Sequence, residues 1–219
     1  MAQQAPVPDS TDHYIAPEEF FVFSQIGNDV LYTGLISGSG FVSVVGDGTL
    51  IMGAAQPFEG EVQVRGGKIK LALDNAFNST ASILLTYDNW GSWSLLDLDG
   101  HSLSTRNLVL NGGILKNGRL EEVAGSPSLI YAFEGEIDSI MGGATSRPEL
   151  RVTVFFDKPE TVRLRGQNEF GIVTVDRGAI LHLLAGTTTA DSLSGSRCRF
   201  CACWRQRQLE CTRHGDGVD

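Results

Sequence analysis

Short runs of alternating hydrophobic and polar residues recur along the chain from residue 20 to about residue 184. In one of them, Val62 and Val64 alternate with Glu61 and Gln63. Successive side chains of a β-strand point to opposite faces, so the two valines share one face and the polar side chains share the other. Comparable runs occupy residues 41–45, 68–71, 96–98, 108–110, 150–154 and 172–175, most of them followed closely by Gly, Asn or Asp. The pattern predicts many short strands joined by turns.

Helical periodicity is weak throughout the chain. The one candidate segment, residues 74–80, is short and contains two asparagines, which favour turns over helix interiors. We therefore expect an all-β protein.

The strand pattern repeats itself at a long period. The run Thr49 to Gly53 leads to Phe58 and then to the strand at residues 61–65, and the run beginning at Thr161 leads in the same way to Phe170. The offset between the copies is constant up to the phenylalanine and falls by one after it, so one deletion aligns them. A third correspondence matches residues 32–36 with residues 133–137. Two units of about 110 residues, the second incomplete, favour a solenoid over a Greek-key sandwich.

Stacking explains why such a repeat is stable. A coil of roughly 20 residues cannot bury its apolar face alone, but neighbouring coils complete a continuous core. At a strand spacing of about 4.8 Å, the repetitive body would form a rod on the order of 40 Å long. We expect the β-solenoid to span residues 20–190, preceded by a disordered leader or linker at residues 1–19. No capping helix is predicted at either end.

The glycine-rich turns carry a family resemblance. Residues 36–40, 46–53 and 58–67, which read ISGSG, GDGTLIMG and FEGEVQVRGG, resemble the autotransporter-associated β-strand repeat, also called the passenger-associated transport repeat. Residues 96–103 and 110–118 are similar to the segment that follows in that family, and residues 161–183 are similar to a second, more degenerate copy. The resemblance implies a right-handed parallel β-helix in the passenger of a secreted or outer-membrane-anchored bacterial protein.

Charge and hydropathy exclude several classes of function. The net charge of −9 argues against nucleic-acid binding, because phosphate contacts need clustered Lys or Arg. No apolar run approaches the ~20 residues of a membrane-spanning helix. The first residues show no basic segment followed by an apolar one, so no signal peptide is visible and the export route stays open.

Two groups of residues in the body are candidates for ligand binding. Tyr87, Trp90 and Trp93 could stack on sugar rings, or the tryptophans could instead cap the core at a coil corner. Asp97 and Asp99 alternate with leucines and should point outward, where they could bind Ca²⁺ or a sugar, or act as a carboxylate pair. The alternative is that these two aspartates are solvent-exposed residues of the coil surface that bind no ligand.

The last residues differ in composition from the body. All four cysteines and five arginines fall within residues 197–219, whereas residues 1–196 contain no cysteine. Cys198, Cys201, Cys211 and His214 have a spacing that could hold Zn²⁺. The abrupt change also fits an out-of-frame reading, disulfide formation or disorder of a tail at residues 191–219.

These observations favour a non-enzymatic, structural or adhesive segment that acts as a rigid β-helical stalk, secreted or at the bacterial cell surface. We expect no cofactor and no catalytic residues. Partners would be surface glycans or neighbouring solenoid coils of a larger chain. The alternative is a β-helix that binds or degrades polysaccharides, since the same architecture can carry a carboxylate-lined groove.

Overall fold

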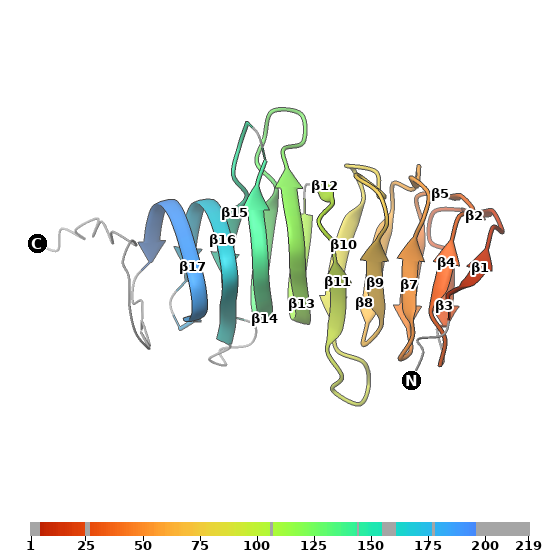
Figure 1. Ribbon diagram of the computed structural model, residues 1–219, viewed down its shortest axis with the longest axis horizontal. Coiled ribbons are helices and arrows are strands. Elements are labelled where there is room, and N and C mark those ends of the chain that lie inside the picture. Colours follow the sequence, from red (N-terminus) through yellow and green to blue (C-terminus); the bar gives the residue numbers. More distant parts are fainter. Residues whose placement is uncertain are drawn as a thin grey trace, which may run out of the picture.

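The chain winds into a stack of coils whose strands lie side by side along the long axis of the molecule (Figure 1). The computed structural model describes residues 5–24, 27–105, 107–143, 145–154, 161–176 and 178–195, and within these ranges it contains strands but no helix. Each strand pairs in parallel with a strand of the next coil. The expected all-β fold and the parallel β-solenoid are thereby confirmed.

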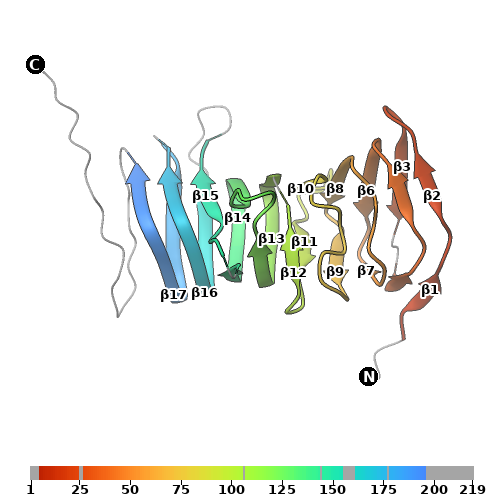
Figure 2. The same ribbon diagram turned by 90° about the horizontal axis from the view of Figure 1, so that it is seen from above.

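Each coil contributes to three faces, which we call A, B and C. Figure 2, seen from above, shows strands of face A along one side of the stack and strands of face B along the other. Face A contains β3 (Phe20–Ser24), β6 (Phe41–Val45), β8 (Glu61–Arg65), β10 (Ser82–Thr86) and β15 (Glu149–Val152). Face B contains β1 (Val7–Asp9), β4 (Val30–Tyr32), β7 (Thr49–Met52), β9 (Lys68–Leu71) and β11 (Ser94–Asp97).

Face C is the least regular of the three. It contains β2 (His13–Ile15), β5 (Ile36–Gly38) and β12 (Ser102–Ser104), and between β5 and β12 a single parallel bridge joins Gln56 to Phe77. Four longer strands bend around the corners and so belong to more than one face: β13 (Asn107–Glu121), β14 (Leu129–Gly142), β16 (Thr161–Val175) and β17 (Ile180–Gly195).

The register of face A sets the length of the stack. Phe41 lies opposite Phe20, and Glu61 lies opposite Phe41. One turn of the solenoid therefore contains about as many residues as the roughly 20 expected from the sequence. Eight successive pairings join nine strand segments across the described part of this face. At about 4.8 Å per strand, the stack is roughly 40 Å long.

The interior is one continuous hydrophobic core built from the alternate positions of every coil. Val62 and Val64 are buried, while Gln63 between them is only partly buried. The strand at residues 82–86 repeats this arrangement, with Ile83 and Leu85 stacked directly on the two valines. The in-register stacking of like side chains is the reason that the alternation read from the sequence predicts the core.

The two copies of the repeat follow the same path through the stack. Thr49 lies opposite Lys68 and Thr161 lies opposite Ile180, so both threonines begin a strand of face B and pair at the same separation along the chain. Phe58 and Phe170 are both buried in the core. The match of residues 32–36 with residues 133–137 is different, because Ile36 begins face C whereas Ile137 belongs to face B.

The expected disordered leader at residues 1–19 is wrong for residues 5–19, which belong to the solenoid. β1 pairs with β4 and β2 pairs with β5, and the backbone N–H groups of Val7 and His13 donate to Asp29 and Leu35 at 2.8 and 2.7 Å. Backbone pairing with the next coil orders this polar segment, although Ile15 is its only fully buried side chain among those described. Because backbone pairing does not depend on side-chain polarity, the composition of the segment gave no sign of it.

Aromatic rings fill the core at the N-terminal end of the stack. The ring of Phe23 lies 4.8 Å from that of Phe21 and 5.1 Å from that of Tyr32, and His13 lies 4.0 Å from Phe21. The Tyr32 hydroxyl donates to the carbonyl of Thr11 at 2.6 Å, and burial, with Asp9 and Asp12 nearby, raises the pKa of Tyr32 to about 12. These rings cover the first layer of the core without a capping helix.

At the other end, β17 pairs with β16 as far as Gly195, so the ladder extends beyond the expected limit at residue 190. Of the expected tail at residues 191–219, the first five residues belong to this strand and the remainder lies outside the described residues.

Candidate functional site

The three candidate aromatic residues lie in and beside the loop that joins β10 to β11, at the edge where faces A and B meet (Figure 1). The coil that contains this loop, from Ser82 to its register partner Asn107, is the longest along face A. The Asp88 carboxylate accepts the backbone N–H groups of Trp90 and Ser92 at 2.8 and 2.7 Å. These hydrogen bonds lower the pKa of Asp88, and the bond from Ser92 has the largest effect. The loop is therefore a fixed turn.

The three rings do not form one sugar-binding platform. The Tyr87 hydroxyl donates to Glu134, two coils further on. The guanidinium of Arg163 lies over the Trp93 ring, 5.8 Å from its centroid. Trp90 is 91% exposed. The alternative that the tryptophans cap the core is also wrong, because neither belongs to it; Tyr87 and Trp93 instead contact later coils.

Asp97 and Asp99 point outward, as expected, but each is paired with a lysine. Lys116 lies 3.0 Å from Asp97, and Lys70 lies 2.8 Å from Asp99. Asn117 also donates to Asp97 at 3.2 Å. Each carboxylate is therefore partly neutralised by a cation of a neighbouring coil, which the spacing along the chain did not predict.

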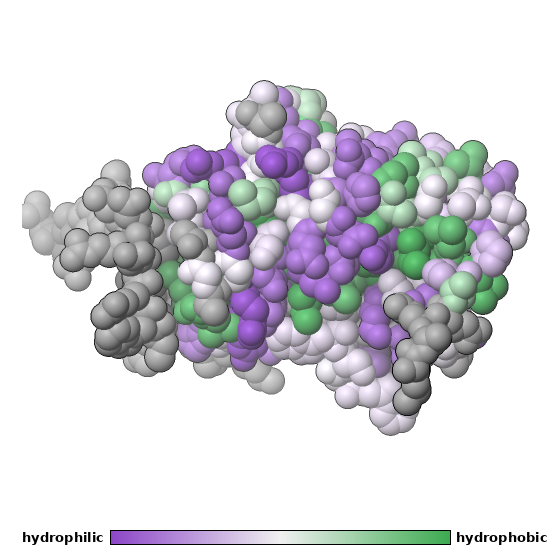
Figure 3. Space-filling view, in the orientation of Figure 1, coloured by the Kyte–Doolittle hydropathy of each residue, from purple (hydrophilic) through white to green (hydrophobic). Residues whose placement is uncertain are grey.

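Asp97 belongs to a column of alternating charge on the outer surface of face B. The register places Lys70 opposite Asp97, Asp97 opposite Lys116, Lys116 opposite Asp138 and Asp138 opposite Arg165. Figure 3, which views this face, shows hydrophilic colour over the middle coils and hydrophobic colour nearer the N-terminal coils. Opposite charges on adjacent strands favour the register, and like charges directly opposite destabilise it.

Reversing the charge of Asp97 should weaken the stack. The substitution Asp97→Lys places three cations in succession along the column, and we expect the free energy of unfolding to fall by about 1 kcal/mol, more at low than at high ionic strength. Urea denaturation at two salt concentrations measures the effect. The control Asp97→Asn removes the ion pair without adding a like charge and should cost less. Equal losses for the two variants, or no dependence on salt, would contradict the role of the column.

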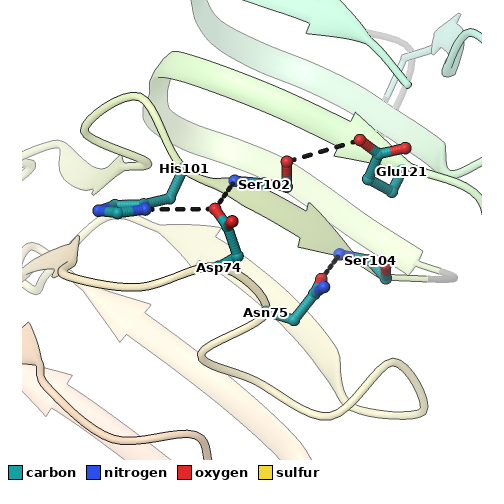
Figure 4. Close-up of polar contacts among 6 residues, drawn as sticks. All are labelled: Asp74, Asn75, His101, Ser102, Ser104 and Glu121. Carbon is teal, nitrogen blue, oxygen red and sulfur yellow. Dashed lines mark hydrogen bonds and ion pairs between the residues drawn. The ribbon is translucent and has the colours of Figure 1, made fainter. Parts of the chain in front are cut away.

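A cluster of polar contacts joins β12 on face C to the turn at residues 74–75 of the preceding coil (Figure 4). The Asp74 carboxylate accepts the backbone N–H of Ser102 at 2.8 Å and lies 3.2 Å from Nδ1 of His101. The Ser102 hydroxyl lies 3.5 Å from Glu121, not against His101. The cluster therefore holds an aspartate–histidine pair, but it does not align a serine hydroxyl with the imidazole as a nucleophile would require.

The contacts of Asp74 should make the fold sensitive to acid. The hydrogen bond from the Ser102 N–H, and to a lesser extent that with His101, lower the pKa of Asp74 below its value in the unfolded chain. The ionised Asp74 therefore stabilises the fold above pH ~4, and this stabilisation is lost as the pH falls further. We expect the acid-induced loss of stability to be smaller in Asp74→Asn than in the wild type. Urea midpoints measured from neutral to acidic pH test this. The control Glu59→Gln alters an exposed carboxylate that makes no side-chain hydrogen bond or ion pair within the described residues, and it should retain the wild-type pH profile.

A groove lies on face C beside this cluster, where the face has no regular strand. It is a shallow depression of about 620 Å³ that is open to solvent, and we call it the lateral groove. Its walls come from four successive coils and consist of uncharged residues: Leu35, Ala55, Gln56, Pro57, Asn75, Phe77, Asn78, Ser79 and Ser104. Its volume lies within the range of small-molecule sites, and its lining combines apolar side chains with amides and hydroxyls.

Sequence reasoning missed both the groove and the polar cluster. The groove residues come from successive coils, and Asp74 meets His101 from the turn of the preceding coil. The sequence suggested only a possible helix at residues 74–80. In the structure Asn75 has a φ of 50°, and its side-chain oxygen accepts the N–H of Ser104 in the next coil. The two asparagines of residues 74–80, which favour turns, are the signal that could have indicated these contacts.

The proposed zinc ligands Cys198, Cys201, Cys211 and His214 lie outside the described residues. Within the part of the chain that the structure describes, no group of three or more His, Cys, Asp or Glu could hold a metal ion. The same part contains no helix long and apolar enough to cross a membrane.

Comparison with known proteins yields no relative: no protein-family model, curated protein or solved structure matches the chain. The resemblance to the autotransporter-associated repeat thus stays a prediction based on the glycine-rich turns.

Proposed function

We propose that this chain is a structural segment of a secreted or cell-surface bacterial protein, acting as a rigid, non-enzymatic β-helical stalk that spaces or presents adhesive regions. The observation that carries the proposal is the continuous parallel pairing of strands along the stack, from β1 to β17. Each coil hydrogen-bonds to the next, and one continuous hydrophobic core runs from one end of the stack to the other.

Stiffness follows from this arrangement. In a solenoid, bending between two coils would have to open backbone hydrogen bonds and part the core at that layer. The alternating charges of face B and the contacts of Tyr87 and Trp93 with later coils add links along the axis. These features support a role in holding two points at a constant separation.

A distance measurement tests the stalk. Spin labels introduced as unnatural amino acids at the exposed positions Thr11 and Ser192 lie near the two ends of the stack. Pulsed electron resonance should give one narrow distribution, centred on a distance on the order of 40 Å. A broad or two-component distribution would overturn the rigid stalk. Antibody labelling of intact source cells tests the surface location separately, and labelling only after permeabilisation would overturn it.

Polysaccharide binding is a second candidate function, favoured by the lateral groove. Its uncharged lining on a chain with a net charge of −9 suits a neutral ligand better than a charged one. Asp97 and Asp99 give little support to a polysaccharide-degrading role, because both are engaged with lysines, Asp97 on face B and Asp99 in the turn that follows β11.

A further inference from the structure

The lateral groove exists because face C changes its structure between β5 and β12. Across this interval the chain passes through residues 53–60 and 72–81, which are joined only by the Gln56–Phe77 bridge. Irregular turns follow the core less closely than strands do, and a hollow remains between the turns. The groove crosses several coils and therefore runs along the axis of the stack.

Hydrogen bonds hold the walls of the groove in place. The buried Gln56 amide donates to the carbonyls of Gly34 and Ala54 at 3.2 and 2.8 Å and accepts the N–H of Ile36 at 2.6 Å. The oxygen of Asn75 accepts the N–H of Ser104 at 2.8 Å, and the oxygen of Asn78 accepts the N–H of Thr80 at 3.1 Å. A preformed wall of this kind lowers the cost of ordering the site when a ligand binds.

The same bonds leave donors available to a ligand. Asn75 and Asn78 use their oxygens, and within the described residues their NH₂ groups have no partner. The hydroxyls of Ser79 and Ser104 likewise have no side-chain partner in that part of the chain. Such groups can donate to, or accept from, the hydroxyls of a sugar.

Apolar surface completes the lining. Leu35 is 46% exposed, Ala55 and Pro57 are exposed, and Phe77 is buried in the wall behind them. The carbon face of a pyranose ring would cover this surface, while its hydroxyls would meet the amides and hydroxyls. Because coils repeat at about 4.8 Å along the groove, a step comparable to one sugar ring, successive rings can meet successive turns.

We infer that the lateral groove binds a neutral oligosaccharide chain aligned with the axis of the solenoid. No formally charged side chain lines the groove, so an uncharged glycan loses no ion pair on entering it, whereas an anionic glycan would find no cation there. The inference rests on the second candidate function and is independent of the stalk.

The test is to fill the groove and to measure binding by the full chain. Isothermal titration calorimetry with cello- and malto-oligosaccharides and with polygalacturonate supplies neutral and anionic probes. Ala55→Trp places a bulky ring in the groove, and we expect it to weaken binding of a neutral oligosaccharide by about tenfold or more. Ala72→Trp is the matched control, an exposed alanine outside the groove, and should bind as the wild type does. Circular dichroism checks that both variants are folded.

The variant Trp90→Ala separates the groove from the aromatic loop. If Trp90→Ala abolishes binding and Ala55→Trp does not, the glycan binds at the loop, and the groove is not the site. Preference for polygalacturonate would overturn the neutral ligand class. If the wild type binds none of the oligosaccharides, both the inference and the second candidate function fail, and the stalk is unaffected.

Discussion

Replacing Phe58 with alanine should lower the free energy of unfolding by about 3–5 kcal/mol. The Phe58 side chain is 1% exposed and fills the core at the corner where face C turns into face A. Alanine would leave a cavity there, and the coils above and below, fixed by their own backbone bonds, could collapse into it only in part. Urea denaturation followed by circular dichroism measures the loss.

Phe20→Ala is the matched control for this variant. Phe20 is 70% exposed and contacts Phe41 in a stacked pair at 4.7 Å, so its removal should cost only about 1 kcal/mol. Similar losses for the two variants would mean that the corner phenylalanine does not pack as described. Phe170→Ala should behave like Phe58→Ala, because Phe170 is buried in the same way in the second copy of the repeat.

The glycine that follows Phe58 should tolerate no side chain. A Cβ atom at Gly60 would overlap the carbonyl oxygen of Gly40 in the preceding coil and press against the Phe58 ring. Relief would require two hydrogen-bonded coils to separate, so we expect Gly60→Ala to cost about 2–3 kcal/mol. Thermal and urea unfolding of the full chain measure this cost.

The second copy of the repeat offers the control. Gly171 follows Phe170 directly, and a Cβ there would lie 3.3 Å from the nearest atom, the carbonyl oxygen of Arg147. Gly171→Ala should therefore change stability by less than about 1 kcal/mol, and the reduced freedom of the unfolded chain offsets part of any loss. If Gly171→Ala lowers stability as much as Gly60→Ala does, close approach between coils does not explain why residue 60 must be glycine.

This pair also explains the break in the repeat. The offset between the copies falls by one after the phenylalanine, because Glu59 separates Phe58 from its glycine and nothing separates Phe170 from Gly171. The deletion falls at a corner between two faces. Strands on either side keep their register, since a corner can lose a residue without turning the adjoining strand over.

The sequence by itself determined the class of fold and the core. Alternation of side chains is a local property of each strand, and in a parallel stack it is sufficient to decide which residues face inward, as Val62, Val64, Ile83 and Leu85 show. The outward position of Asp97 followed from the same rule. The repeat was visible because equal positions of successive coils meet equal surroundings.

Only the tertiary structure decided which outward residues meet. Side chains on the surface contact partners one to three coils away: Asp97 meets Asn117 of the next coil, whereas Tyr87 reaches past it to Glu134. Loop lengths set these offsets, and hydrophobic alternation does not encode them. The same holds for the leader, whose β1 and β2 are ordered by hydrogen bonds between backbone groups, which every residue type except proline can donate. The lateral groove was equally hidden from the sequence, because irregular turns create it and four different coils supply its walls.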